Sequence, residues 1–531
     1  MLTNFPVTVM VFDHVMPPYI FPTGLKINTE EYLKVLETHT LPWICKVATG
    51  RPYVWQQNSA PSHTLRKSQG ISLNPDAILP LRTIYFTAFD KNTKTRINHS
   101  VGELKVNVFS PPNSRSLIRG FRRVTDGGNG IYLFQSKLIG SYVDLEFQLQ
   151  IGDDTIQNFI INGEFHGEHC ECPIDAEKWL NAIQCTNNIE QIELDMSSFD
   201  KINVENLGEE AKSRLNGFAI LHYVIKNGKL YRKSYSSIDG FKMFSDMMYL
   251  AILRRVHLPD MEFLHNLGDY PAEKRKVEQK PLPVFSWCGS DDTRDIVLPT
   301  WDVTYSTLQT MYKVSMDIES LPLHAKIPFA ERNRTAFWRG RDSRNERLEL
   351  ARLSQRNKTV LDAGITRYFF FKDKEAELGR KSEVPFYRFF DYKYVLSLDG
   401  TVAAYRLPYL LTGGSAIFKQ DSPYYEFFYR KLRPMEHYIP LKRNIEDVFE
   451  KLQWAKNNDK KVYEIGIKAK ELMFENLLPQ HILCYYYQVL YEYSKKQVGT
   501  VDIRPGMEEV KSDDRLDHIK CNCKPETHSE L

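Results

Sequence analysis

The stretch YVLSLDGTVAAYR occupies residues 394–406 and decides the fold of the region around it. Residues 394–398 form a short apolar run typical of a buried strand, and Asp399 with Gly400 indicates a tight turn. A helix is expected from this turn to about Leu411, followed by a glycine pair and a new strand at residues 415–418. This order predicts a β-α-β unit, whose helix start would offer free N–H groups and a positive dipole end to a phosphate.

A second candidate anion site lies upstream, in the stretch FWRGRDSRNER at residues 337–347. It places four arginines and a glycine directly before residues 348–353, a segment typical of a helix. Arginine suits phosphate because its planar guanidinium binds two oxygens at once. The alternative interpretation is that the four arginines form a solvated charged face.

These two stretches resemble the signatures of the protein O-glucosyltransferases of glycosyltransferase family 90, which includes the Rumi-type and the fungal capsule-associated transferases. Four further segments resemble the branch of KDEL-motif-containing proteins: FSWCGS at residues 285–290, DIVLP at 295–299, HYIP at 437–440 and HSEL at 528–531. The resemblance covers roughly residues 68–531. It implies an α/β glycosyltransferase with the two-lobed fold called GT-B.

Length and patterning divide the 531 residues into four parts, since such a chain is too long for one core. Residues 1–67 are unassigned: they lack the basic start and uninterrupted apolar core of a signal peptide. A mispredicted first exon, an alternative start and a novel extension are the interpretations left open there. Residues 68–165 alternate apolar and polar positions, as in residues 143–151, which predicts an antiparallel β-sandwich. The resemblance implies that this sandwich is a filamin-type, immunoglobulin-like domain.

Residues 166–507 are expected to form the glycosyltransferase domain, and residues 508–531 a tail. Helices and strands alternate in the larger region, with a helix expected at residues 243–256 and strands at 262–267 and 284–287. Asn444 is expected to cap a further helix. This pattern predicts α/β architecture, and its length allows two Rossmann-like halves that face a cleft.

Asp269 is the candidate catalytic base, because transfer of a sugar to a serine needs a proton acceptor near the attacking hydroxyl. It follows a predicted strand in LHNLGDYP, residues 264–271, where α/β proteins place their sites. The resemblance matches Asp269 to the family's catalytic aspartate. The alternative is an aspartate that only ends a strand before a turn.

The resemblance also implies that residues of the two stretches at 337–347 and 394–406 contact the nucleotide sugar. Arg347 and Arg406 match arginines of the family and suit the diphosphate, whereas Arg341 stands where Rumi-type enzymes have serine. Ala403 and Ala404 fit a crowded helix start, with helical core packing as the alternative. The implied donor-binding residues are Arg341, Arg347, Val402, Ala403, Ala404, Tyr405 and Arg406.

No metal and no cofactor are expected beyond the donor substrate, UDP-glucose or UDP-xylose. Asp291, Asp292 and Asp399 lack the Asp-x-Asp spacing of a manganese site, and arginines with a helix dipole can stabilise the leaving group instead. The eight cysteines include two Cys-x-Cys pairs without the spacing of a zinc site, so disulfides are expected. The resemblance implies a disulfide between Cys170 and Cys484.

The remaining features concern compartment and partners. Basic residues number 70 and acidic residues 67, and no apolar run is long enough to span a membrane, so neither a nucleic-acid partner nor a membrane span is expected. The tail His528, Ser529, Glu530 and Leu531 predicts retrieval to the endoplasmic reticulum lumen by a KDEL-receptor-like protein. Sequons at Asn98, Asn333 and Asn357 are candidate glycosylation sites.

The resemblance implies an inverting enzyme that moves glucose from UDP-glucose to serine in folded EGF-like repeats of the Notch type. Residues 231–244 lack the cysteine-closed acceptor loop of Rumi-type enzymes, so the choice of acceptor serine is expected to differ. Xylose transfer from UDP-xylose is the nearest competing activity. A non-catalytic lumenal binding protein and a polysaccharide xylosyltransferase are the alternatives from other classes.

Overall fold

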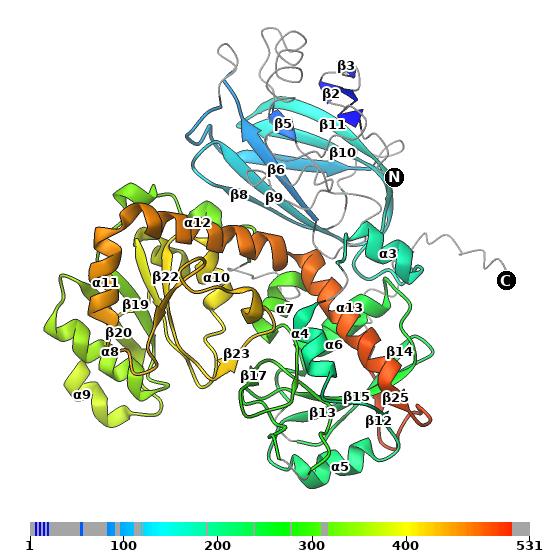
Figure 1. Cartoon of the computed structure of the whole chain (residues 1–531). Helices are drawn as coiled ribbons and strands as arrows, with labels where there is room; N and C mark the ends of the chain where they lie inside the picture. The colour runs from blue at the N-terminus through cyan, green and yellow to red at the C-terminus, as the bar shows by residue number, and fades with distance from the viewer. Residues whose placement is uncertain are drawn as a thin grey trace. The chain divides into compact units, whose positions relative to one another are not determined.

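The structure is a computed structural model that describes residues 82–90, 96–110, 118, 120–186, 189–236, 239–276, 279–308 and 317–511, with five short strands before residue 57. The chain divides into two compact units (Figure 1). The first comprises residues 1–77 and 82–167, and the second comprises residues 78–81 and 168–531. The predicted retrieval signal at residues 528–531 lies outside the described residues.

In its described residues, the first unit contains two larger antiparallel sheets. One sheet contains β5 (Val54–Gln56), β6 (Arg82–Ala88), β9 (Ile131–Leu138) and β8 (Gly120–Asp126); the other contains β11 (Asp154–Phe165), β10 (Tyr142–Ile151) and β7 (Leu104–Phe109). Two further pairs of short strands are β1 (Pro6–Val7) with β4 (Tyr19–Ile20) and β2 (Met10–Val11) with β3 (His14–Val15).

One hydrophobic core lies between the two larger sheets of this unit. Phe134 of β9 and Phe147 of β10 meet edge to face with ring centroids 6.1 Å apart. The turn between β8 and β9 uses Gly128 and Gly130, both with positive φ, which glycine adopts readily. The alternation at residues 143–151 is confirmed as strand β10.

The second unit contains two larger sheets, each associated with helices. The first sheet has six strands in the order β18 (Ile296–Val297), β16 (Val284–Ser286), β15 (Met261–Asn266), β13 (Ile220–Lys226), β14 (Lys229–Ser234) and β26 (Glu508–Glu509). The second has five strands in the order β20 (Leu361–Arg367), β19 (Ala336–Arg341), β21 (Tyr394–Ser397), β22 (Ala416–Gln420) and β24 (Ile439–Leu441).

The second sheet is parallel throughout, as the predicted β-α-β unit requires. All five of its strands therefore end at one edge of the sheet. The first sheet is mixed instead, because β13 pairs antiparallel with both β14 and β15, while β15 and β16 are parallel. The prediction of α/β architecture is confirmed, but the first sheet is not the parallel half that a Rossmann-like unit would have.

The helices of the second unit are α3 (Ala176–Ala182), α4 (Glu190–Met196), α5 (Leu207–Arg214), α6 (Lys242–Leu253), α7 (Trp301–Leu308), α8 (Asn345–Arg356), α9 (Glu375–Leu378), α10 (Leu407–Thr412), α11 (Val448–Asn457), α12 (Asp459–Asn476) and α13 (Pro479–Lys496). Smaller strand pairs are β12 (Ile202–Asn203) with β25 (Gln497–Val498) and β17 (Gly289–Ser290) with β23 (Tyr424–Tyr425). Within the described part of the chain, no helix combines the length and the apolar character needed to cross a membrane.

Two connections join the sheets of the second unit. β17 follows the first sheet's β16, and β23 follows the second sheet's β22, so their antiparallel pairing bridges the two. At the end of the chain, α12 packs against β22 and α10, whereas α13 packs against α4 and α7 (Figure 1). The break between α12 and α13 lies at Leu477 and Leu478, directly before the proline that begins α13.

Two local predictions are wrong. The helix predicted to begin with an Asn444 cap begins instead at Val448, and the Asn444 side chain accepts a hydrogen bond from the nearby Glu446 N–H. The disulfide of Cys484 is formed with Cys185, not with Cys170, with Cα atoms 5.3 Å apart. The Cys185 pairing attaches the segment after α3 to α13, and Cys170 is itself disulfide-bonded to a different partner.

Candidate active site

Asp269 lies in a turn directly after β15, at the end of the strand where the sequence predicts it. The buried side chain of Asn266 shapes this turn: its oxygen accepts from the Gly268 N–H at 3.0 Å, and its amide donates to the Tyr270 carbonyl at 2.8 Å. The Asp269 side chain is exposed to solvent. Desolvation by the surrounding protein nevertheless raises the pKa of its carboxyl.

The arginine-rich segment runs from β19 into the start of α8, and the segment 398–406 follows β21, which is the neighbouring parallel strand. Both predicted anion sites therefore meet at the same edge of the second sheet. Gly340 is needed there, because a Cβ atom at this position would lie 2.6 Å from the Trp338 ring and 2.9 Å from the Arg406 guanidinium. The absence of a side chain at Gly340 lets Arg406 approach β19. The Nη1 atom of Arg406 donates a hydrogen bond to the Arg339 carbonyl at 2.6 Å.

Arg347 is the most enclosed arginine of the first stretch, and it lies in the first turn of α8. Its guanidinium donates to the carbonyls of Leu398, at 2.9 Å, and Arg341, at 3.1 Å, while its Nε has no hydrogen-bond partner. Burial lowers its pKa to about 9, and the nearby positive charge of Arg406 adds to this effect. Arg347 is thus a buried cation held by neutral groups.

The other arginines of this segment have different roles. Arg339 makes a two-pronged ion pair with Asp362, with both N–O distances 2.9 Å, and is therefore already neutralised. Arg344 donates to the carbonyls of residues 400 and 401 and so fixes the loop between β21 and α10. Arg341 is exposed and lies over the ring of Phe369, 5.2 Å from its centroid. The four arginines are neither one solvated face nor four equivalent ligands.

None of Arg341, Arg344, Arg347 and Arg406 forms an ion pair within the described residues. Asp399 follows β21 at the same edge and interacts electrostatically with Arg344 and Arg347. It accepts a hydrogen bond from Ser422, and burial raises its pKa to about 6. Uncompensated arginines at the ends of parallel strands are suited to an anionic ligand.

The segment after β21 departs from its predicted form. The helix begins at Leu407, not at the Asp399-Gly400 turn, so Val402 to Arg406 form a loop and α10 has only six residues. Among the hydrogen bonds of the described residues, none uses a backbone N–H of residues 400–406 as its donor. Val402, Ala403 and Ala404 are buried, as close packing of this loop requires. The predicted helix start is therefore wrong, and a loop whose N–H groups bond to no acceptor among the described residues lies in its place.

The two sheets meet at Asp269. The hydroxyl of Tyr405, from the loop after β21, donates to the backbone carbonyl of Asp269 at 3.4 Å. The structure thus brings together the predicted base and one predicted donor-binding segment that lies 136 residues further along the chain. Sequence patterns carry no signal for this contact, because it depends on the packing of two separate sheets.

Acidic residues considered as metal ligands are engaged elsewhere. Asp292 pairs with Lys274 at 2.7 Å and accepts a hydrogen bond from Ser290. The described residues contain no group of three or more His, Cys, Asp or Glu side chains that could hold a metal ion. The three sequon asparagines, Asn98, Asn333 and Asn357, are all exposed.

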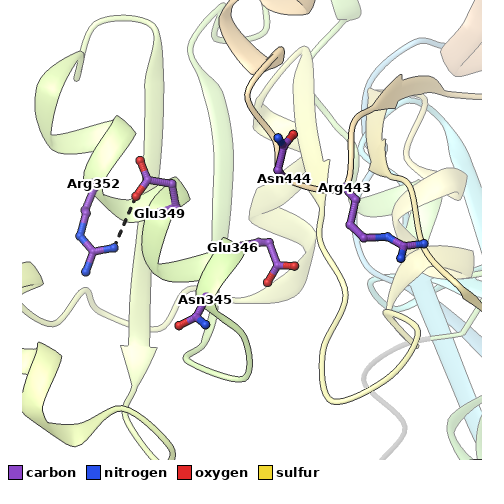
Figure 2. Close-up of a pocket in the computed structure, with 6 residues that line it drawn as sticks. All are labelled: Asn345, Glu346, Glu349, Arg352, Arg443 and Asn444. Atoms are coloured by element: carbon purple, nitrogen blue, oxygen red, sulfur yellow. Dashed lines mark hydrogen bonds and ion pairs between the residues drawn. The ribbon is translucent and has the colours of Figure 1, made fainter.

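A separate pocket of about 610 Å³ lies beside the start of α8 and is lined by both acids and bases (Figure 2). Glu349 and Arg352 form an ion pair there at 3.4 Å. None of the predicted donor-binding residues lines this pocket, and its charges are balanced. It is therefore a poorer candidate for a diphosphate than the neighbouring edge around Arg347.

Comparison with known proteins identifies the family of this chain. The chain is 40% identical to protein O-glucosyltransferase 3 of Homo sapiens over 496 residues, covering 91% of this chain and 97% of that protein. It is also 40% identical to protein O-glucosyltransferase 2 of Danio rerio over 461 residues, covering 86% of this chain and 91% of that protein. A solved structure of TarM shares 11% identity, covers 87% of this chain and 85% of that one, and has a TM-score of 0.27, too slight a likeness to specify the fold.

The family model described as glycosyl transferase family 90 matches residues 181–527, which include Asp269 and both arginine-bearing segments. The matched region contains both sheets of the second unit. The chain belongs to glycosyl transferase family 90 and is a sugar-transferring enzyme.

Proposed function

We propose that this protein transfers glucose from UDP-glucose to a serine hydroxyl in folded EGF-like repeats, with inversion at the anomeric carbon. The observation that carries the proposal is the contact between Tyr405 and Asp269. It brings the backbone of the Asp269 turn, whose carboxyl has a raised pKa, next to the loop of residues 400–406, and that loop shares its sheet edge with arginines that form no ion pair among the described residues. A proton acceptor and an anion site are the two elements that glycosyl transfer to an alcohol needs.

The transfer step assigns one role to each side of the site. Asp269 accepts the proton of the serine hydroxyl as its oxygen attacks the anomeric carbon and the bond from that carbon to the diphosphate oxygen breaks. The electron pair of the broken bond leaves with UDP. Arg347, Arg406 and the N–H groups of the loop stabilise the negative charge that develops on the diphosphate. Arg341, which is exposed, serves the outer part of the donor.

Arginines held by carbonyls are suited to this role. Arg347 and Arg406 each donate to backbone oxygens, which fixes their orientation without cancelling their charge. Burial lowers the pKa of both, to about 9 for Arg347 and about 10 for Arg406, and a bound diphosphate would favour their charged forms. The negative charge of a bound donor would therefore compensate the positive charges of Arg347 and Arg406, which form no ion pair among the described residues.

Several finer assignments belong to the same proposal. The two-lobed GT-B arrangement fits two sheets that both present their strand ends to the site, and the filamin type fits the all-β first unit. The endoplasmic reticulum lumen is the proposed compartment, supported by the Cys185–Cys484 disulfide and the tail at residues 528–531. The relatives named protein O-glucosyltransferases support a protein acceptor.

The test is incubation of the purified protein with a folded EGF-like repeat and either UDP-glucose or UDP-xylose, read by intact mass. We expect the repeat to gain one hexose with UDP-glucose. Gain of a pentose only would reassign the donor, since the two sugars differ by one hydroxymethyl group. If the protein hydrolyses neither donor and transfers sugar to no repeat, the proposal is rejected. A binding protein with an inert transferase fold would then be the better interpretation.

A further inference from the structure

The backbone carbonyl of Asp269 accepts hydrogen bonds from two side chains, one associated with each sheet. The Cys288 thiol donates to it at 3.3 Å, and the Tyr405 hydroxyl donates to it at 3.4 Å. A carbonyl oxygen has two lone pairs, so one oxygen can accept both. Asp269 itself lies in a turn, so these two donors hold a residue that regular secondary structure does not hold.

Cys288 belongs to a rigid part of the site. It lies between β16 and β17, is fully buried and is a free cysteine. The next residue, Gly289, packs so closely that a Cβ atom there would lie 2.5 Å from the Tyr425 ring of β23. Burial raises the pKa of the thiol well above its ordinary value, so it remains protonated and able to donate.

Tyr405 belongs to the part of the site that would meet the donor substrate. Its backbone lies in the loop of residues 400–406, whose N–H groups have no protein acceptor among the described residues. Its side chain reaches across to Asp269 and lies next to Cys288, and burial keeps its hydroxyl protonated by raising its pKa. A ligand that orders this loop therefore also orders one of the two groups that hold Asp269.

We propose that Cys288 and Tyr405 are positioning residues that fix the Asp269 turn for proton transfer, and that Tyr405 couples donor binding to the position of the base. Cys288 supplies a constant support from the first sheet, and Tyr405 supplies a support that depends on the donor loop. The inference rests on the proposed function, in which Asp269 is the base. It predicts effects on turnover that are separate from effects on donor affinity.

The size of the effect follows from how positioning acts. Loss of one neutral hydrogen bond should lower kcat roughly three- to tenfold while the other donor still holds the carbonyl. Loss of both leaves the Asp269 carbonyl without these two donors, while Asn266 still bonds the turn at Gly268 and Tyr270. A displacement of about 1 Å at reacting atoms costs roughly 100-fold. The double variant should therefore lose more than the product of the two single losses, because both donors support the same oxygen.

The experiment compares Cys288→Ala, Cys288→Ser, Tyr405→Phe and the double variant Cys288→Ala with Tyr405→Phe in the full chain. Turnover and KM are measured with UDP-glucose and a folded repeat, and UDP binding is measured by calorimetry. We expect the Cys288→Ala and Tyr405→Phe variants to lower kcat by a larger factor than they lower UDP affinity, because a coupling between donor loop and base acts in both directions. Cys288→Ser should restore most of the turnover, since its hydroxyl also donates.

Three results would overturn the proposal. If Cys288→Ser is no better than Cys288→Ala, Cys288 is a packing residue. If the double loss does not exceed the product of the single losses, the two donors do not jointly support one oxygen. If the single variants lose UDP affinity in step with turnover, Tyr405 acts in donor binding alone. The Asp269→Asn variant distinguishes the proposed function from the positioning role. If Asp269→Asn keeps its activity, the assignment of Asp269 as the base fails. If Asp269→Asn is inactive while the Cys288 and Tyr405 variants keep full turnover, the positioning role fails.

Discussion

Asp269 and Arg347 both follow strands that end at the site, yet the protein holds them by different means. Neutral hydrogen bonds shape the Asp269 turn, and its carboxylate is left exposed. Arg347 is buried, held by carbonyls and surrounded by other arginines. The base is thus free to meet an acceptor, whereas the charge at the donor edge is fixed before the donor arrives. This difference separates the variants that should stop chemistry from those that should weaken binding.

The largest effect is expected for Asp269→Asn, which keeps the shape of the side chain but cannot accept the serine proton. Removal of a general base lowers turnover roughly 100-fold or more. UDP affinity should stay unchanged, because the donor edge lies on the other sheet. Turnover is measured by transfer to a folded repeat and affinity by calorimetry. A variant that keeps turnover within a few-fold of the wild type would show that another group accepts the proton.

A change in the acceptor tests the same side of the comparison. An exposed carboxylate needs the serine presented at a fixed angle, and an unfolded repeat must be ordered on binding. Ordering costs about 1 to 2 kcal/mol per residue, so a few residues reduce activity roughly 100-fold. We expect the folded repeat to be labelled and its reduced, alkylated form to remain unlabelled, as read by intact mass. Equal labelling of both would indicate recognition of local sequence.

The sequence predicts most of what depends on local pattern. The strand β21 and the strand β15 before Asp269 follow from apolar runs and turn residues, and both appear where expected. The mixed first sheet is not visible in such patterns, because strand direction is set by connections between distant elements. The start of α10 was misplaced for a similar reason: Arg344 holds the carbonyls of residues 400 and 401 outside a helix.

Partners that are distant in sequence also decide what each arginine of the first stretch can do. Arg339 cannot be told from Arg347 by spacing, but Arg339 forms an ion pair with Asp362 and Arg347 forms none among the described residues. The same limit applies to the disulfide of Cys484, since eight cysteines allow many pairings and the resemblance suggested Cys170. Only packing identifies Cys185 as its partner.

The donor side of the comparison is tested by Arg347→Ala and Arg406→Ala. Each removes a charge-assisted contact to the diphosphate, which should cost about 1.5 to 3 kcal/mol, or roughly tenfold or more in affinity. UDP and UDP-glucose should weaken equally, because the contact is to the diphosphate and not to the sugar. Calorimetry with both ligands measures this.

The matched control is Arg352→Ala, which lies on the same helix as Arg347 but forms a surface ion pair with Glu377. Its removal should leave UDP affinity unchanged. Equal losses in Arg352→Ala and Arg347→Ala would indicate that general charge, and not the position of Arg347, attracts the donor.

The smallest effect concerns pH, and its sign follows from the environment of Asp269. Desolvation by the surrounding protein raises the pKa of this carboxyl above the ordinary value of about 3.9. Transfer needs the carboxylate, so kcat/KM should be lost as the pH falls through that raised pKa, at a pH above the one expected for an aspartate with an ordinary pKa. Asp399→Asn is the control, because burial also raises the pKa of Asp399, to about 6, on the donor edge. The acidic limb of the pH profile should stay in place in this variant, whatever its absolute activity. If the acidic limb of the kcat/KM profile shifts in Asp399→Asn, the titrating group is Asp399 on the donor side of the site and not Asp269.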